Sequence, residues 1–427
     1  MASNTELHQR RNAVFPRGMG ALHPIYIERA RNAEMWDVEG KRYIDFAGGI
    51  AVLNTGHSHP VINLAVQQQV ERFSHTCLMV NPYESAIELA EKLCTLAPIS
   101  GEKKAFFVST GAEAVENAIK IARAATGRSG VIAFTGGFHG RTHYAMGLTG
   151  KVVPYKAGFG PFPAEIHHVP FPIEYHGVTV EDSIAAIHSL FKCSIEPSRV
   201  AAIILEPVQG EGGFYAAPPE LMRALRQICD QHGILLIADE IQTGFARTGT
   251  MFAMQQYDVE ADLMTMAKSL AGGYPLAAVV GRAAVMDAPA PGGLGGTYAG
   301  SPVAIAAALA VLKVIEDEQL VQRSQTLGEL LLARLKALQA RYPQRIGEVR
   351  GKGAMVAMEF VKQGDAHQPD ADVTKAVVLA AAQAGLILLS CGTYANVIRF
   401  LMPLTAPDAL VEEGLAILAT VLEQTLV

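Results

Sequence analysis

The sequence lacks the cysteine pattern of a disulfide-stabilised or zinc-binding protein. Its five cysteines, an odd number, are scattered and form no C-x-x-C pair. Such usage indicates neither a disulfide framework nor a tetrahedral zinc site. The thirteen histidines include close pairs at 57/59 and 167/168, but neither pair has cysteine or carboxylate neighbours at metal-ligand spacing. We therefore expect reduced thiols, loop histidines and no metal site.

An excess of positive charge is also absent. The formal net charge is −6, the isoelectric point is near 6.1, and lysine and arginine form no run. A protein without a basic patch has no electrostatic means of attracting nucleic acid or an anionic membrane. Small molecules are the expected partners.

Long apolar runs are missing too. The first residues, MASNTELHQRRNAV, have no apolar core of a secretory signal. The most apolar segments, 303–312 and 377–389, are too short to cross a bilayer or are broken by Gln383 and Gly385. We expect a cytoplasmic protein with no membrane partner. At 427 residues and 50% hydrophobic composition, the chain is long enough to bury a large core.

Residues 104–280 alternate short β-rich runs with helical periodicity, which predicts a mainly parallel sheet with crossover helices. The segment APPELMRALRQICDQHG predicts one crossover helix. Pro219 is typical of a first helical turn, and Gly233 is typical of the residue that ends a helix. Leu221, Leu225 and Ile228 share one face of that helix. The expected strands are AFFVST, GVIAFTG, VAAIILEPV, ILLIADEI, DLMTMAKS and PLAAVVG.

The C-terminal part has a different order. A long amphipathic helix over about 319–341 is followed by strand-like GAMVAMEFV, a helix, LILLS, NVIRFLMPL and a last helix. This order suits a small α+β domain. The segment MWDVEGKRYIDF predicts a hairpin around Glu39 and Gly40. The expected organisation is an N-terminal arm (1–60) packing with the small domain, a large domain (61–318) and the small C-terminal domain (319–427).

The stretch ILLIADEIQTG ends an apolar strand in two carboxylates, Asp239 and Glu240. A buried ionised carboxylate costs several kcal/mol unless a cation or hydrogen-bond donors compensate it. One candidate cation is Mg²⁺ in a P-loop ATPase, but that enzyme needs G-x-x-x-x-G-K-[ST]. The three Gly-Lys pairs lack a following Ser or Thr, and G-x-G-x-x-G is absent. Nucleotide hydrolase and dehydrogenase are therefore disfavoured.

The other candidate is the pyridinium of pyridoxal phosphate, which a carboxylate keeps protonated. This cofactor also needs a lysine, and Lys268 follows the next strand-like run, LMTMA. Most lysines at strand ends are surface residues, but an amine at a desolvated strand end usually has a chemical role. Two successive strands would bring Asp239 and Lys268 to one edge of the sheet. Ser109, Thr110 and the residues that follow open a helix with free N–H groups for a phosphate, although Glu113 fits simple capping equally well.

Six motifs in order carry a family resemblance. They are STGAEAVENAIKIAR, FHGRTHYAMGLTGK, EPVQGEGGF, ADEIQTGFARTG, AKSLAGG and GGLGGTYAG. Together they resemble the class III pyridoxal-phosphate aminotransferases, in particular the bacterial 4-aminobutyrate aminotransferases, over essentially the whole chain. The resemblance implies PLP fold type I, an α/β fold, with a large cofactor domain, a small domain and active sites at the interface of a homodimer. Whether two such dimers pair into a dimer of dimers stays open.

The resemblance also implies the roles of the residues that hold pyridoxal phosphate. Lys268 would be the Schiff-base lysine and Asp239 the partner of the ring nitrogen. Gln242 would approach the phenolic oxygen, and Phe138 would stack on the ring with Ile241 behind it. The other implied cofactor-binding residues are Gly111, Ala112 and His139, and Thr297 from the other subunit.

For the substrates, the resemblance points to Ile50, Arg141, Glu206, Glu211 and Arg399. A guanidinium fork at Arg141 would hold the distal carboxylate, although a structural loop role fits Arg141 equally well on its own. Glu211, between glycines that we interpret as flexible, would pair with Arg399 when an amine donor is bound and swing away for glutamate.

Two positions depart from the family pattern. Met79 stands where many relatives have Gln, and Ser301 where Asn is usual. Met79 removes a hydrogen-bonding group near the expected substrate entrance, which bears on the choice of donor.

The function implied is a ping-pong aminotransferase that moves the amino group of an ω-amino acid, foremost 4-aminobutyrate, to 2-oxoglutarate, giving succinate semialdehyde and glutamate. Close alternatives are 5-aminovalerate, ornithine or a diamine as donor. A PLP-binding regulatory sensor is disfavoured, because the arm of roughly 40 residues has no room for a DNA-binding domain.

Overall fold

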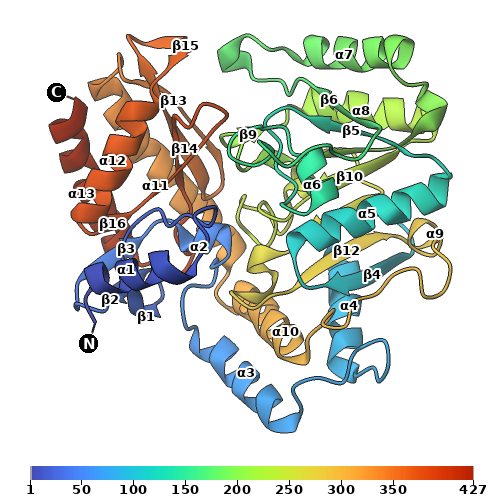
Figure 1. Cartoon of the computed structure of the whole chain (residues 1–427), viewed down its shortest axis with the longest axis horizontal. Coiled ribbons are helices and arrows are strands. Elements are labelled where there is room, and N and C mark those ends of the chain that lie inside the picture. The colour runs from blue at the N-terminus through green and yellow to red at the C-terminus, as the bar shows by residue number, and fades with distance from the viewer. Residues whose placement is uncertain (1, 427) are drawn as a thin grey trace.

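The computed structural model describes residues 2–426, which form two α/β bodies side by side (Figure 1). The larger one is built on a seven-stranded sheet. Its strand order is β4 (Lys103–Val108), β12 (Ala277–Arg282), β11 (Leu263–Met266), β10 (Leu235–Asp239), β7 (Val200–Leu205), β5 (Gly130–Phe134) and β6 (Ile166–Val169).

Helices cover both faces of this sheet, as the alternation of side chains along each strand requires. Leu236 belongs to one hydrophobic cluster and Ile237 to the other. On the first face lie α4 (Glu84–Leu96), α7 (Val180–Cys193), α8 (Pro219–His232) and α10 (Pro302–Asp317); on the second lie α5 (Gly111–Thr126), α6 (His143–Leu148) and α9 (Ala283–Met286). The predicted helix α8 begins at Pro219, and Gly233 ends it in a left-handed conformation.

One strand departs from the expected parallel arrangement. The run PLAAVVG forms β12, which pairs antiparallel with both β11 and β4. Residues 267–276, which link β11 to β12, contain only the short 3₁₀ turn η4 (Lys268–Ala271). Parallel neighbours require a long crossover, usually a helix, so this short link reverses the chain direction. The sheet is therefore mainly, not wholly, parallel.

The second body contains a five-stranded sheet in which β13 (Ile346–Lys352), β14 (Met355–Lys362), β18 (Val397–Phe400) and β17 (Leu389–Cys391) are neighbours, and β15 (Asp365–Pro369) pairs with β14. Three helices accompany it: α11 (Leu320–Arg341), α12 (Ala371–Gln383) and α13 (Asp408–Leu426). The predicted helix over about 319–341 is α11. Strand β13 was not expected, because charged residues interrupt the apolar positions of its sequence, IGEVRGK. In the fold this strand is half-buried.

A third sheet joins the two ends of the sequence. Its order is β1 (Ile27–Arg31), β2 (Glu34–Asp37), β3 (Arg42–Asp45) and β16 (Leu386–Ile387). The hairpin expected around Glu39 and Gly40 is present between β2 and β3. Strand β16 pairs parallel with β3, so the N-terminal segment contacts the C-terminal body. The domain boundaries at residues 60 and 318 stay a prediction.

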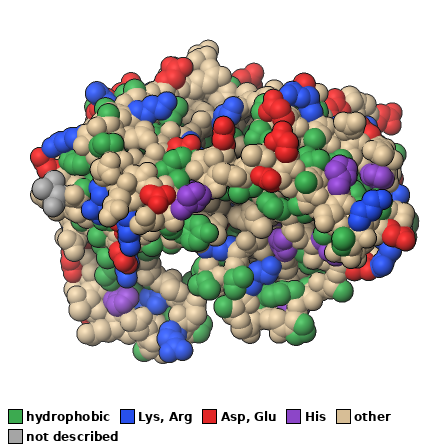
Figure 2. All heavy atoms as spheres, turned by 90° about the horizontal axis from the view of Figure 1, so that it is seen from above, with side chains coloured by type: hydrophobic (Ala, Val, Ile, Leu, Met, Phe, Trp, Pro, Cys, Tyr) green, Lys and Arg blue, Asp and Glu red, His purple; other side chains and the backbone are tan. Residues whose placement is uncertain are grey.

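The remaining elements are short or peripheral. They are α1 (Asn4–Val14), α2 (Gly48–Ala51), α3 (Pro60–Arg72), β8 (Val208–Gln209), β9 (Tyr215–Ala216), η1 (Glu174–His176), η2 (Pro197–Arg199) and η3 (Ala253–Gln256). In the face shown in Figure 2, acidic and basic side chains are mixed, and the surface is hollowed between two lobes. Among residues 2–426, no helix combines the length and apolar character needed to span a bilayer.

Candidate active site

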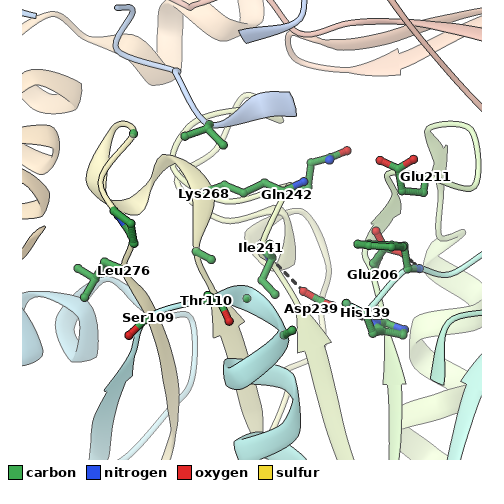
Figure 3. A pocket seen from close by; sticks show the side chains of 18 of the residues that line it. Ser109, Thr110, His139, Glu206, Glu211, Asp239, Ile241, Gln242, Lys268 and Leu276 are labelled. Carbon is green, nitrogen blue, oxygen red and sulfur yellow. Dashed lines mark hydrogen bonds and ion pairs between the residues drawn. The ribbon is translucent and has the colours of Figure 1, made fainter. Parts of the chain in front are cut away.

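Asp239 and Lys268 meet at one edge of the seven-stranded sheet. Strands β10 and β11 pair in parallel, with Asp239 opposite Thr265, and Lys268 follows β11 as the first residue of η4. This confirms the prediction that two successive strands bring the carboxylate and the amine together. Figure 3 shows both side chains in the cavity at this edge.

Asp239 is buried, and its two carboxylate oxygens have separate partners. One oxygen lies 2.7 Å from Nδ1 of His139, and the other accepts bonds from the Thr265 hydroxyl (3.0 Å) and the Ile241 N–H (3.2 Å). Burial acts to lower the pKa of His139, but the hydrogen bond and charge of Asp239 outweigh it and the pKa is raised. The nearest cationic partner of Asp239 in the chain is thus His139, which follows β5.

Lys268 is partly accessible, into the cavity, and has a left-handed backbone with φ of 50°. A non-glycine residue in this region is strained, and such strain persists where the surroundings fix it. Burial lowers the pKa of the Lys268 amine to about 8, while the negative charge of Glu211 opposes the shift. A lysine with this pKa has a substantial neutral, nucleophilic fraction near neutral pH.

The N-terminus of α5 forms the floor of the cavity. Thr110 caps the helix in a capping box with Glu113, whose carboxylate accepts the N–H groups of Ser109 (3.0 Å) and Thr110 (2.8 Å). The first-turn N–H groups of Gly111 and Ala112 have no acceptor within the helix. A Cβ on Gly111 would lie 2.9 Å from the terminal methyl carbon of Ile241, so the lack of a side chain here lets Ile241 pack closely against the helix start. The floor therefore offers backbone donors and a helix dipole to an anion.

These elements enclose a cavity of about 370 Å³. Ten of the residues expected at the site line it: Gly111, Ala112, Phe138, His139, Glu206, Glu211, Asp239, Ile241, Gln242 and Lys268. Ser109 and Thr110, expected at the phosphate-binding helix start, also line it, together with residues that sequence reasoning missed, among them Val52, Tyr274 and Leu276. Tyr274 and Leu276 come shortly after Lys268, just beyond a pair of glycines. This closeness in sequence to Lys268 could have identified them as cavity residues.

Four expected residues do not line the cavity. Thr297 is exposed, and so is Arg141, whose guanidinium lies 4.7 Å from the ring centre of Tyr155. Ile50 is 45% exposed and lies in α2, a turn whose residues all have positive φ. Arg399 lies behind Glu211 on β18. The single chain thus brings the expected cofactor residues together except Thr297, and only part of the substrate set.

Glu211 and Arg399 form an ion pair across two sheets, with 2.5 Å between Oε1 and NH1. The other Glu211 oxygen accepts the Tyr155 hydroxyl at 3.0 Å. Burial acts to raise the pKa of Glu211, but Arg399 outweighs it and the pKa is lowered. The Nε atom of Arg399 is buried and has no hydrogen-bond partner among the described residues. Tyr155, which links the pair to Arg141, was not predicted.

Glu206 occupies the cavity wall beside His139 (Figure 3). Its carboxylate accepts the backbone N–H of Phe138 at 2.8 Å and that of Gly210 at 2.9 Å. Burial raises the pKa of Glu206 to about 7, against the opposing charge of His139. Glu206 therefore holds the loop of Phe138 to the loop of Glu211, and it does not contact Arg141 here.

The residues present fit pyridoxal phosphate. The cavity combines helix N–H donors for a phosphate, an amine for a carbonyl, and a buried carboxylate for a ring cation. Gln242 lines the cavity and presents Oε1 as a buried polar atom without a hydrogen-bond partner among the described residues. Within residues 2–426, no group of three or more His, Cys, Asp or Glu side chains is arranged to hold a metal ion.

Comparisons with known proteins agree with this geometry. The sequence model of the family described as aminotransferase class-III matches residues 14–422. The chain is 59% identical to the 5-aminovalerate aminotransferase DavT of Pseudomonas aeruginosa and 56% identical to the 4-aminobutyrate aminotransferase GabT of Escherichia coli, with 98% of each chain covered in both cases. The solved structure of an (S)-enantioselective ω-transaminase from Thermomicrobium roseum matches with a TM-score of 0.91 at 32% identity over the whole of both chains.

Proposed function

Because the chain belongs to the class III aminotransferases, we propose that it moves the terminal amino group of an ω-amino acid, foremost 4-aminobutyrate, to 2-oxoglutarate. The products are succinate semialdehyde and glutamate. Enzymes of this class depend on pyridoxal phosphate, which is therefore the cofactor of this chain. The observation that carries the proposal is the Glu211–Arg399 ion pair on the wall of the Lys268 cavity.

Pyridoxal phosphate supplies an electron sink that stabilises negative charge on the carbon next to the amino group. The chain supplies the groups around it. The Lys268 amine would hold the cofactor and would move a proton at the reacting carbon. Asp239 holds the proton on the ring nitrogen, and His139 fixes the orientation of Asp239 through the 2.7 Å contact. The N–H groups of Gly111 and Ala112 hold the phosphate.

The Glu211–Arg399 pair explains how one cavity serves two substrates. An ω-amino donor has no carboxylate beside the reacting carbon, and an unpaired buried guanidinium there would be costly. Glu211 neutralises Arg399 in that case. With glutamate, the α-carboxylate takes this role and the Glu211 side chain turns away. Arg141 then holds the distal carboxylate of either substrate, and Ile50 contacts its carbon chain.

A second donor, 5-aminovalerate, is favoured by a specific observation. The relative that is 59% identical over 98% of the chain is named a 5-aminovalerate aminotransferase. Met79 lies near Gly295, where a Cβ would come within 2.4 Å of its sulfur, and it is 58% exposed. The resemblance puts Met79 near the substrate entrance, where a flexible thioether would tolerate one more methylene in the donor. Ornithine and a diamine are the remaining candidates.

We further propose that the enzyme works as a homodimer in the cytoplasm. Thr297 is exposed next to Tyr298, and the large side chains of Met79 and Tyr298 are both exposed, with Met79 close to Gly295. A second copy covering this surface would bring Thr297 to the phosphate of the neighbouring site. The five free cysteines suit a reducing compartment. Sedimentation of the holoenzyme would show dimers or a dimer of dimers.

The test is a set of single-turnover half-reactions with the holoenzyme. Each donor, namely 4-aminobutyrate, 5-aminovalerate, ornithine and a diamine, is mixed separately while the absorbance of the bound cofactor is followed. We expect 4-aminobutyrate to give the highest kcat/KM, and 2-oxoglutarate to restore the starting spectrum. A higher value for 5-aminovalerate would move the assignment to the second donor. Failure of every ω-amino compound would overturn the proposed function.

A further inference from the structure

The loop that carries Glu211, residues 210–214, is tightly packed. It joins β8 to β9, which pair antiparallel. A Cβ on Gly210 would lie 2.3 Å from Oε1 of Gln242, and one on Gly212 would lie 2.8 Å from the carbonyl oxygen of Gly136. Close contacts account for both glycines and favour a fixed backbone over the flexible one that the sequence suggested. A movement of Glu211 is then a rotation of its side chain on a fixed backbone.

The five-stranded sheet fixes two carbonyl groups of this loop. The Gly213 oxygen accepts two bonds from the Arg350 guanidinium, from Nε at 2.9 Å and from NH2 at 2.7 Å. The carbonyl oxygen of Glu211 accepts the N–H of Gly392 at 2.9 Å. Both donors come from the C-terminal body, so the loop position depends on contacts between the two bodies.

Arg350 is itself fixed at its other end. Its NH1 lies 2.7 Å from Glu359 and 2.6 Å from Glu348, and its guanidinium stacks 3.7 Å from the ring centre of Tyr215. Glu359 is buried and also accepts the Tyr215 hydroxyl at 2.6 Å. The planar fork of arginine allows all these contacts at once, which a lysine ammonium does not.

We propose that Arg350 is a positioning residue for the choice between the two substrate classes. By fixing the backbone of residues 210–214, it places the Glu211 carboxylate against Arg399 when the bound donor has no α-carboxylate. The inference rests on the proposed function, because it acts through the Glu211–Arg399 pair. Arg350 contacts none of the residues lining the cavity except through this loop, so its effect is on one half-reaction.

The first test replaces Arg350 by Lys. Arg350→Lys keeps a cation near Glu359 but cannot donate two parallel bonds to the Gly213 oxygen. In single-turnover kinetics of the holoenzyme, we expect kcat/KM for the amine donor to fall about tenfold, and that for glutamate less than about twofold. The matched control is Arg345→Lys just before β13, where the guanidinium pairs with Asp370. It should leave the ratio of the two half-reactions unchanged.

A second variant and a second readout separate positioning from general damage. Tyr215→Phe removes the bonds of the hydroxyl to Glu359 and His176 and keeps the stacked ring, so a smaller loss of about threefold in the same direction is expected. Hydrogen exchange of the holoenzyme should show faster exchange at the amides of residues 210–214 in Arg350→Lys than in Arg345→Lys. Unchanged exchange there, or equal losses in both half-reactions, would overturn the role of Arg350.

The Glu211→Gln background distinguishes the two levels of the argument. If Arg350 acts through Glu211, then Arg350→Lys adds no further selective loss in that background. A full additional loss there would overturn the inference and leave the proposed function intact. If Glu211→Gln alone shows no selectivity, the ion-pair explanation of dual specificity fails, and the role of Arg350 fails with it. The donor panel decides the aminotransferase function independently of both.

Discussion

Two adjacent carboxylates at the end of β10, Asp239 and Glu240, have different surroundings on the two faces of the seven-stranded sheet. Asp239 points into the cavity and pairs with His139, a titratable group. Glu240 points away from the cavity, where its carboxylate accepts the Thr243 hydroxyl and the N–H groups of Ala253 (3.1 Å) and Met254 (2.7 Å). The Asp239 carboxylate is therefore placed to bind a cationic ligand in the cavity, whereas the Glu240 carboxylate links two segments of the core by hydrogen bonds.

This difference teaches that burial alone does not mark a functional carboxylate. Both side chains are buried; Asp239 is the last residue of β10 and Glu240 the one that follows it, so the alternation of the strand directs them to opposite sides. Burial raises the pKa of Glu240 to about 7 despite its three hydrogen bonds. The functional member is recognised by its ionisable partner and by the lysine at the same edge. The predictions below change groups on each side of the sheet.

The largest effect is expected at Lys268. Lys268→Ala removes the amine from the cavity, so turnover should fall about 10⁴-fold, the upper range for loss of a proton-transfer group. After borohydride treatment, the intact mass should show no covalently bound cofactor. Lys151→Ala is the control: this partly buried lysine donates to the Gly392 carbonyl oxygen and should leave the adduct in place. Normal turnover of Lys268→Ala would remove Lys268 from the mechanism.

A large but smaller effect is expected at Asp239. Asp239→Asn keeps the shape but removes the charge that holds a proton on the ring nitrogen. The rate of the donor half-reaction should fall about a hundred- to a thousandfold while cofactor binding weakens much less. The neighbouring Glu240→Gln removes a charge on the other face and should leave that rate near the wild-type value. Equal rate losses in the two variants would erase the distinction between the faces.

A selective effect is expected on the far wall of the cavity. Glu211→Gln weakens the neutralisation of Arg399, so the 4-aminobutyrate half-reaction should lose roughly ten- to a hundredfold in kcat/KM. The glutamate half-reaction should change much less, because the substrate carboxylate replaces Glu211. Single-turnover kinetics measures both. Equal losses would leave Glu211 as a structural residue that fixes Tyr155 and Arg399.

The sequence was sufficient for the parts of the site that lie on neighbouring strands. Asp239 and Lys268 follow two consecutive apolar runs, and adjacent parallel strands end at the same edge. The antiparallel direction of β12 was missed, because an apolar run such as PLAAVVG does not indicate the direction of its strand. Only the short link after Lys268 indicates that the chain reverses there. His139 as the partner of Asp239 was equally invisible, since β5 and β10 are separated in the sheet by β7.

Contacts between the two bodies were beyond pattern reasoning. Arg399 is a charged residue within the apolar segment NVIRFLMPL and so requires a partner, but only the family resemblance named Glu211. Arg350 lies in a strand that the sequence did not reveal, and its bond to the Gly213 carbonyl involves backbone atoms, which carry no residue signature. The roles of Thr297 and Ile50 stay predictions.

The smallest expected effect is on stability, and it belongs to Glu240. Its pKa in the folded chain, about 7, lies above the usual value of 4.5 because burial disfavours the charged form. Stability from the protonated form is therefore fully present below about pH 4.5 and is lost as the pH rises to about 7. By linkage, the loss is on the order of 1–3 kcal/mol.

Glu240→Gln stays neutral at every pH, so this contribution disappears from its profile. The amide accepts only one of the two N–H groups of Ala253 and Met254, which costs about 1 kcal/mol at all pH values. At pH 5 the variant should therefore melt below the wild type, and the gap should close or reverse by pH 8. Midpoints of thermal unfolding for both holoenzymes, measured from pH 5 to 8, test this. Parallel profiles would mean that the hydrogen bonds keep Glu240 ionised throughout, and that its side of the sheet, like that of Asp239, holds a charge.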